Sequence, residues 1–252
     1  MKTCRTLLIA LAALLLCAIA SSAASVRLTA INLDCAQKAI NTQQMRSVLL
    51  YMQPDIVALH SLPQPAEARG GNASVASLAQ SMRMYYAYVP AYSGADFGSA
   101  LLSRYPIRKP AAISDSPTGR LQGLKAEVRI DKKMLDVVML RPSSAAEGTY
   151  AVTAVSQLLK GAKKRHFLVM ASFDSGMALD TVKGLGRAGL QDAAVALRSI
   201  QPTYPAASPK ERLDFFLVSP TMRPHLKSVK RIKSGLLRGG SDHLPVELAF
   251  TF

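Results

Sequence analysis

Hydrophobic runs of strand length alternate along the chain with segments of helical spacing. Apolar side chains three and four residues apart predict a helix over Thr42–Met52, which Pro54 ends. The other predicted helices are Ala73–Met82, Tyr150–Lys160, Asp180–Ala188 and Asp192–Arg198. The predicted strands are Val26–Ile31, Asp55–Leu59, Tyr85–Val89, Ser99–Ser103, Leu124–Ile130, Leu135–Leu140, Phe167–Ala171, Leu213–Val218 and Val246–Phe250.

This order of elements is neither a regular strand–helix alternation nor an all-β series. The pair Leu124–Ile130 and Leu135–Leu140 is predicted to form a hairpin across Asp131–Lys133. The pattern favours a mixed α/β fold, a four-layer sandwich in which two mixed β-sheets pack face to face and helices flank them. No repeat or linker interrupts residues 25–252, so we expect them to form one domain.

The first 24 residues have the pattern of an export signal. A basic start precedes the apolar run Thr6–Ala20, and the small residues Ser21–Ala24 follow it. The run is shorter than the ~20 apolar residues of a membrane span. We therefore expect cleavage after Ala24, no membrane span afterwards, and a secreted or periplasmic monomer; a retained membrane anchor is the alternative. Only Cys35 would remain, which excludes an internal disulfide.

The charge of the chain is strongly positive, with 31 Lys and Arg against 16 Asp and Glu and a formal net charge of +15. Basic residues cluster in Lys160–Arg165 and Arg223–Arg238. Such a charge favours polyanionic partners: nucleic acid, phospholipid head groups or an anionic surface polymer. The alternative is a solvated surface that keeps an exported protein soluble.

Five segments, taken together and in order, resemble the endonuclease/exonuclease/phosphatase superfamily, including its small exported bacterial hydrolases. The segments are Ala30–Asp34, Pro54–Leu59, Gly98–Ile107, Arg212–Phe216 and Gly240–Val246. The resemblance implies the deoxyribonuclease I-like sandwich, hydrolysis of a phosphodiester or phosphomonoester, and Mg²⁺ as cofactor. A hard cation of this kind prefers carboxylate oxygens, and the attacking water needs a base.

The resemblance also implies site residues. Asn32 matches the family's first Asn, and Asp242 and His243 match its late Asp–His pair. Asp214 would orient His243, and Asp242 would lie beside the metal or the water. Asp174 stands where the family's Gly-Asp-x-Asn loop has its Asn.

Three positions depart from the family pattern. Ser61 stands at the metal-binding Glu, Met139 at a His and Ser172 at an Asp. Losing one preorganised donor typically costs ~10²–10³ in rate, although such losses need not multiply. The leading hypothesis is therefore a catalytically impaired member that needs no metal and binds an anionic, phosphate-bearing partner, either nucleic acid or phospholipid head groups.

The alternative is an active metal-dependent phosphodiesterase or phosphatase with a rearranged site. Asp34, Asp174 and Asp242 are its candidate Mg²⁺ ligands, because an Asp at position 174 restores one lost charge. His60, beside Ser61, is interpreted as a strand-end His in contact with solvent, with a substitute metal ligand as the other possibility.

Overall fold

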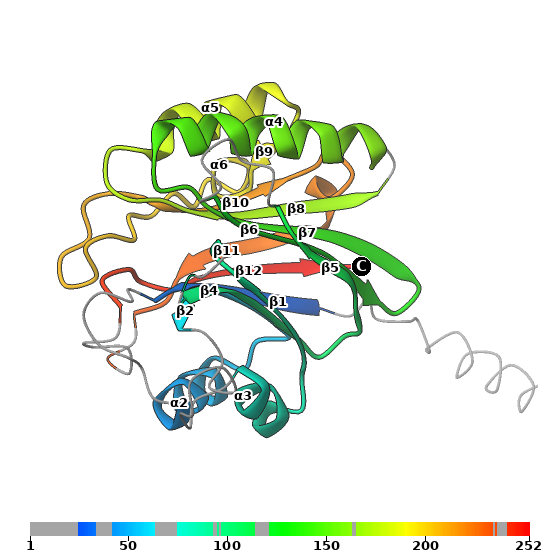
Figure 1. Ribbon diagram of the computed structural model, residues 1–252, viewed down its shortest axis with the longest axis vertical. Coiled ribbons are helices and arrows are strands. Elements are labelled where there is room, and N and C mark those ends of the chain that lie inside the picture. Colours follow the sequence, from blue (N-terminus) through cyan, green and yellow to red (C-terminus); the bar gives the residue numbers. More distant parts are fainter. Residues whose placement is uncertain are drawn as a thin grey trace, which may run out of the picture.

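The computed structural model describes residues 25–33, 42–63, 75–92, 95, 97–113, 121–162, 165–233, 235 and 241–252. Two six-stranded sheets pack face to face, and helices cover their outer sides (Figure 1). This arrangement confirms the predicted four-layer sandwich. The predicted export signal, Asp34 and Cys35 lie outside the described residues. In the described part of the chain, no helix has the length and apolar character needed to cross a membrane.

The first sheet has the strand order β11-β12-β1-β2-β4-β3. Strands β1 and β2 are parallel, and every other pair in this sheet is antiparallel. The strands are β1 (Ser25–Asn32), β2 (Ile56–Pro63), β3 (Tyr85–Pro90), β4 (Phe97–Ser103), β11 (Leu226–Arg231) and β12 (Val246–Thr251). Asn32 and His60 therefore lie side by side where β1 and β2 run toward the same sheet end.

The second sheet has the strand order β5-β6-β7-β8-β10-β9, with β7 and β8 parallel. Its strands are β5 (Ile107–Ala112), β6 (Gln122–Ile130), β7 (Lys133–Arg141), β8 (His166–Ser172), β9 (Gln191–Asp192) and β10 (Asp214–Val218). The predicted hairpin between β6 and β7 is confirmed. Its turn is one residue shorter than expected, because Lys133 already pairs with Ile130 and Asp131 takes a positive φ of 51°.

Helices α2 (Thr42–Met52) and α3 (Val75–Met82) cover the first sheet, and α4 (Ala145–Gly161) and α5 (Ala178–Arg187) cover the second (Figure 1). Helix α4 begins before the predicted Tyr150, because Ser143, Ser144 and Glu147 cap its first turn. The Ser144 hydroxyl accepts from the Glu147 N–H, and the Glu147 carboxylate accepts from the Ser143 N–H. Of the predicted helix Asp192–Arg198, only α6 (Ala193–Ala196) is α-helical, and Asp192 caps it.

Strands β5 and β11 were not predicted from the sequence. Both are edge strands with exposed basic side chains, Arg108 and Lys109 on β5 and Lys227 and Lys230 on β11. Charged side chains on an edge strand prevent pairing with other chains. Part of the positive charge of the chain therefore has a structural role, beside any role in binding. The 3₁₀ turn η2 (Arg223–His225) leads into β11.

Three apolar layers hold the sandwich together. The central layer lies between the sheets and includes Ile56 and Ala58 of β2 and Val137 and Met139 of β7. Two outer layers join each sheet to its helices. Alternate residues of a strand point to opposite faces of the sheet. Inward-facing side chains at the strand ends, past the last apolar residue, can therefore meet across the two sheets.

A bidentate ion pair fastens β9 and α6 to the start of β10. The Arg212 guanidinium lies 2.6 and 2.7 Å from the two carboxylate oxygens of Asp192, and it stacks on the Phe215 ring at 4.2 Å. Both side chains are mostly buried, with exposed fractions of 14% and 12%. A pair of this geometry is costly to break because the remaining charge stays buried.

We predict that Arg212→Ala lowers the free energy of unfolding by about 3 kcal/mol. Lys109→Ala is the matched control, because Lys109 is 75% exposed in its pair with Glu127 and should contribute less than about 1 kcal/mol. Urea unfolding followed by circular dichroism measures both. Equal effects of the two substitutions would contradict a stabilising role for the Arg212–Asp192 pair.

Candidate functional site

A buried hydrogen bond between Asp214 and His243 crosses the two sheets. Asp214 begins β10 of the second sheet, and His243 lies just before β12 of the first. The His243 Nδ1 is 2.9 Å from the Asp214 Oδ2, and the side chains are only 4% and 7% exposed. Asp214 and His243, which the resemblance implied as a pair, are therefore brought together although they lie in different sheets and 29 residues apart in sequence.

The surroundings of this pair favour its charged form. Burial alone would raise the pKa of Asp214, but hydrogen bonds from His243, Thr203 and Ser172 hold it below its usual range. Burial alone would lower the pKa of His243, yet the hydrogen bond and charge of Asp214, with the charge of Asp242, raise it above its ordinary value. Asp214 is thus an anion that holds the His243 ring in one orientation.

The second ring nitrogen of His243 faces the open side of the site. Its Nε2 lies 3.8 Å from the Asp242 Oδ1, and Asp242 is 44% exposed. The Tyr204 ring packs beside the imidazole with 5.1 Å between ring centres. When Nδ1 donates to Asp214, the neutral ring presents a lone pair at Nε2, which suits proton transfer or a hydrogen bond to a ligand.

Arg141 is a site residue that the sequence analysis missed. It ends β7, and its Nη2 lies 2.9 Å from the Asp174 Oδ1. Its Nε donates to the Asn32 Oδ1 at 3.4 Å. One guanidinium thus contacts two of the predicted site residues. A signal was present, since Arg141 follows the strand in which Met139 replaces the family's His.

The three residues that depart from the family pattern take different positions. Ser172 donates a 2.7 Å hydrogen bond to the Asp214 carboxylate, so it supports the His243–Asp214 pair. Met139 is fully buried in the central apolar layer. Ser61 is buried and has a positive φ of 56°, at an irregularity in the pairing of β2 with β4. None of the three supplies a carboxylate.

His60 is not in contact with solvent, so that prediction was wrong. The residue is 1% exposed, and neither ring nitrogen has a hydrogen-bond partner within the described residues. The alternation of β2 explains its burial, because Ile56 and Ala58 point into the central layer and His60 continues that side. Burial, followed by the positive charge of Arg141, lowers the pKa of His60 to about 3.

The described residues of the site do not fit the Mg²⁺ that the family resemblance implies. Across the described ranges, no three His, Cys, Asp or Glu side chains gather in a way that could hold a metal ion. Asp174 faces the Arg141 guanidinium and Asp242 faces His243, while Asp34 lies outside the described residues. A fixed guanidinium beside Asp174 repels a divalent cation, and two serine hydroxyls replace the carboxylates that would attract one.

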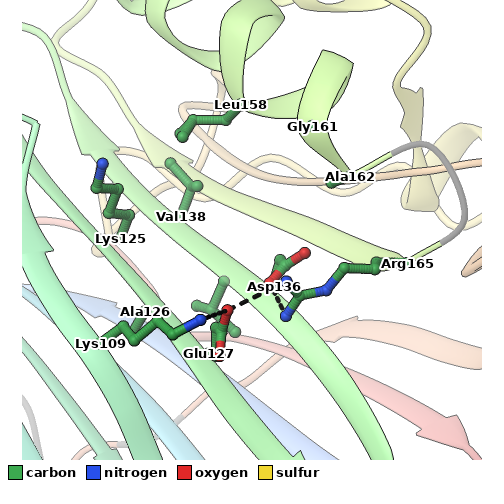
Figure 2. A pocket seen from close by; sticks show the side chains of 11 residues that line it. Lys109, Lys125, Ala126, Glu127, Asp136, Val138, Leu158, Gly161, Ala162 and Arg165 are labelled. Atoms are coloured by element: carbon green, nitrogen blue, oxygen red, sulfur yellow. Dashed lines mark hydrogen bonds and ion pairs between the residues drawn. The ribbon is translucent and has the colours of Figure 1, made fainter.

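A separate hollow of about 240 Å³ lies on the outer face of the second sheet, at the end of α4. Figure 2 shows Arg165 reaching between Glu127 and Asp136, with Lys109 on the other side of Glu127. The Arg165 nitrogens lie 3.1 and 2.6 Å from these two carboxylates. Both carboxylates of the hollow are thus paired with cations, Lys125 is a further basic residue of its lining, and no predicted site residue lines it.

The buried, neutral His60 makes the fold sensitive to acid. Its pKa of about 3 in the folded chain lies below the ordinary 6.5, so between these values only the unfolded chain takes up the proton. Stability then falls as the pH drops below about 6.5, by at most ~1.4 kcal/mol per pH unit. The raised pKa of His243 acts above pH 6.5, where stability is lost as the pH rises.

We predict that His60→Gln flattens the dependence of the unfolding free energy on pH between about 4 and 6.5. Urea titrations at several pH values measure it. An unchanged slope in the variant would show that His60 is not the group responsible.

Solved structures with this architecture include several nucleic-acid enzymes. D. rerio TDP2 complexed with a single-strand DNA product is 17% identical over 91% of this chain and 100% of its own, with a TM-score of 0.68. A variant of the 3′ phosphatase NExo from Neisseria, bound to a product DNA hairpin, is 17% identical over 90% and 100%, with a TM-score of 0.68. At these identities the likeness establishes the fold alone.

An endonuclease/exonuclease/phosphatase family protein from Leptotrichia buccalis has a TM-score of 0.70 at 13% identity, over 90% of this chain and 100% of its own. No curated protein matches the sequence. The model of the Endonuclease/Exonuclease/phosphatase family matches residues 31–243, which include Asn32, Asp214 and His243. This chain therefore belongs to the endonuclease/exonuclease/phosphatase family.

Proposed function

We propose that this chain is an exported, catalytically impaired member of its family that binds a phosphate-bearing group of nucleic acid at the site around His243 and Arg141. The charge balance of that site carries the proposal. Ser61 and Ser172 are neutral where the family pattern has carboxylates, while Arg141 remains as a cation beside Asn32 and Asp174. Two carboxylates are replaced by serines and Asp174 restores one charge, so the negative charge around the guanidinium is lower than in the family pattern, which favours an anion over a metal ion.

Impaired catalysis follows from the same replacements. The family resemblance implies a metal-dependent reaction, and the described residues of the site do not fit a metal ion. Each missing preorganised group typically costs ~10²–10³ in rate, and groups that act as a unit are not additive. The expected result is hydrolysis far below that of an intact family member, with the shape of the site preserved.

Nucleic acid is the favoured partner class for two reasons. The solved TDP2 and NExo structures hold DNA products, and both share the fold of this chain. The net charge of +15, of which Lys2 and Arg5 would leave with the export signal, adds attraction to a phosphate backbone, which acts over many contacts and weakens with salt. Phospholipid head groups carry the same phosphate chemistry and form the competing outcome of the test.

Export is a further part of the proposal, supported by the sequence of residues 1–24 with its basic start, apolar run and small residues. It places the protein outside the cytoplasm, in the periplasm or the medium. Amino-terminal sequencing of the protein purified from culture fractions tests it. A cytoplasmic protein that retains residues 1–24 would contradict export.

A second candidate function is hydrolysis itself, and the intact His243–Asp214 hydrogen bond favours it. Asp214 fixes the tautomer of His243, and when the ring is neutral its Nε2 is able to accept a proton from water, as a general base requires; the raised pKa of His243 makes it a stronger base. This function predicts a measurable rate that depends on His243.

We expect the purified protein to bind a short single-stranded oligonucleotide saturably, and more tightly when the strand carries a terminal phosphate. Fluorescence anisotropy measures binding, and gel electrophoresis with phosphate release measures hydrolysis of the same strand. Lys227→Ala is the matched control, because Lys227 is exposed on the edge strand β11 and away from the site; it should leave the phosphate preference unchanged.

Three results would contradict the proposed binding function. Hydrolysis at the ordinary rate of the family, lost in His243→Asn, would establish the second candidate instead. Binding without any preference for the terminal phosphate would reduce the interaction to surface charge. Preference for vesicles of anionic phospholipid over the oligonucleotide would name the other partner class.

A further inference from the structure

We propose that the Arg141 guanidinium takes the place of the divalent cation in this chain, so that the site binds a phosphate group without a metal ion. This inference rests on the proposed binding function and deepens it. The inference names the positive charge that binds the phosphate, and the geometry assigns this role to Arg141.

Arg141 lies at the same end of the sandwich as the other site residues. The strand register pairs Leu140 of β7 with Ala171 of β8, and Ser172 of β8 with Asp214 of β10. Arg141 therefore stands one step beyond Leu140, at the level of the buried pair. The electrostatic influence of Arg141 on both His60 and His243 agrees with this placement.

The guanidinium is held in one orientation but keeps donors free. Nε contacts Asn32 and one Nη2 hydrogen contacts Asp174, at 3.4 and 2.9 Å. A guanidinium has five N–H donors, so the Nη1 group and the second Nη2 hydrogen have no acceptor among the described residues. The side chain is 18% exposed, which gives a ligand access to it.

This arrangement matches the chemistry of a phosphate group. A planar fork of N–H donors binds two phosphate oxygens at once, which an ammonium group does not do with the same geometry. Asn32 and Asp174 hold the fork before the ligand arrives, so little side-chain entropy is lost on binding. Asp174 therefore acts here as a partner of the cation, not as a metal ligand.

The binding of a terminally phosphorylated single-stranded oligonucleotide tests the inference, measured by anisotropy with excess EDTA and again with added Mg²⁺. We expect the two affinities to agree. Arg141→Gln should weaken binding about 10- to 100-fold, the equivalent of a charge-assisted hydrogen bond, and Arg141→Lys should weaken it less while retaining a phosphate preference. Arg104→Gln is the matched control, since Arg104 is 51% exposed and follows β4 at the opposite end of the sandwich; it should change affinity less than about twofold.

Two results would overturn the inference. One is binding that EDTA abolishes and Mg²⁺ restores. That result would remove the proposed role of Arg141 but would leave the proposed binding function intact. The other is unchanged affinity in Arg141→Gln. If the unmodified protein binds no phosphate-bearing strand in either buffer, the proposed function itself fails. Thermal unfolding shows whether each variant is folded. If Arg141→Gln does not fold, Arg141→Lys and the comparison with and without EDTA test the inference in its place.

Discussion

The hydrogen bond between Asp214 and His243 is the constraint on which the arrangement of the site depends. The space between the sheets is apolar throughout its centre, so polar side chains can meet only at its ends. Asp214 belongs to one sheet, and His243 precedes a strand of the other. Ser172 and Thr203 donate to the same carboxylate, which keeps it charged although it is buried. The bond therefore closes one end of the sandwich.

The segment before β12 is positioned by the same network. The Ser241 hydroxyl accepts from the His243 N–H at 3.0 Å and donates to the backbone carbonyl of Asn32. The Leu244 N–H donates to the Thr203 carbonyl at 2.8 Å. Asn32 in turn contacts Arg141. A continuous set of contacts thus joins the buried pair to the guanidinium.

The electrostatic character of the site follows from what surrounds these two groups. Ser61 and Ser172 carry no charge, and His60 is neutral because burial and Arg141 lower its pKa. Asp174 compensates part of the Arg141 charge. The remaining N–H donors of Arg141 have no acceptor among the described residues, so an anion would gain from them and a divalent cation would not. The family fold is retained, and the proposed change is the replacement of carboxylates by neutral side chains at its site.

The fold class and the His243–Asp214 partnership were predictable, since apolar periodicity marks the inner strands and motif order marks the family. Edge strands β5 and β11 were missed because exposed Arg and Lys side chains hide the apolar alternation. Arg141 was missed because its partners lie 109 and 33 residues away along the chain. His60 was misjudged because the strand was predicted to end at Leu59, whereas β2 continues to Pro63 and its alternation places His60 on the buried side.

The central claim is that a phosphate group lies at Arg141 with no metal ion beside it. Phosphorus-31 NMR of a bound, terminally phosphorylated oligonucleotide, titrated with Mn²⁺, tests this most directly, because a paramagnetic ion in the site broadens the phosphorus signal strongly. The account predicts that the bound phosphate shows no more broadening than the same strand bound loosely to a basic control protein. Selective, saturable broadening of the terminal phosphate signal would contradict it.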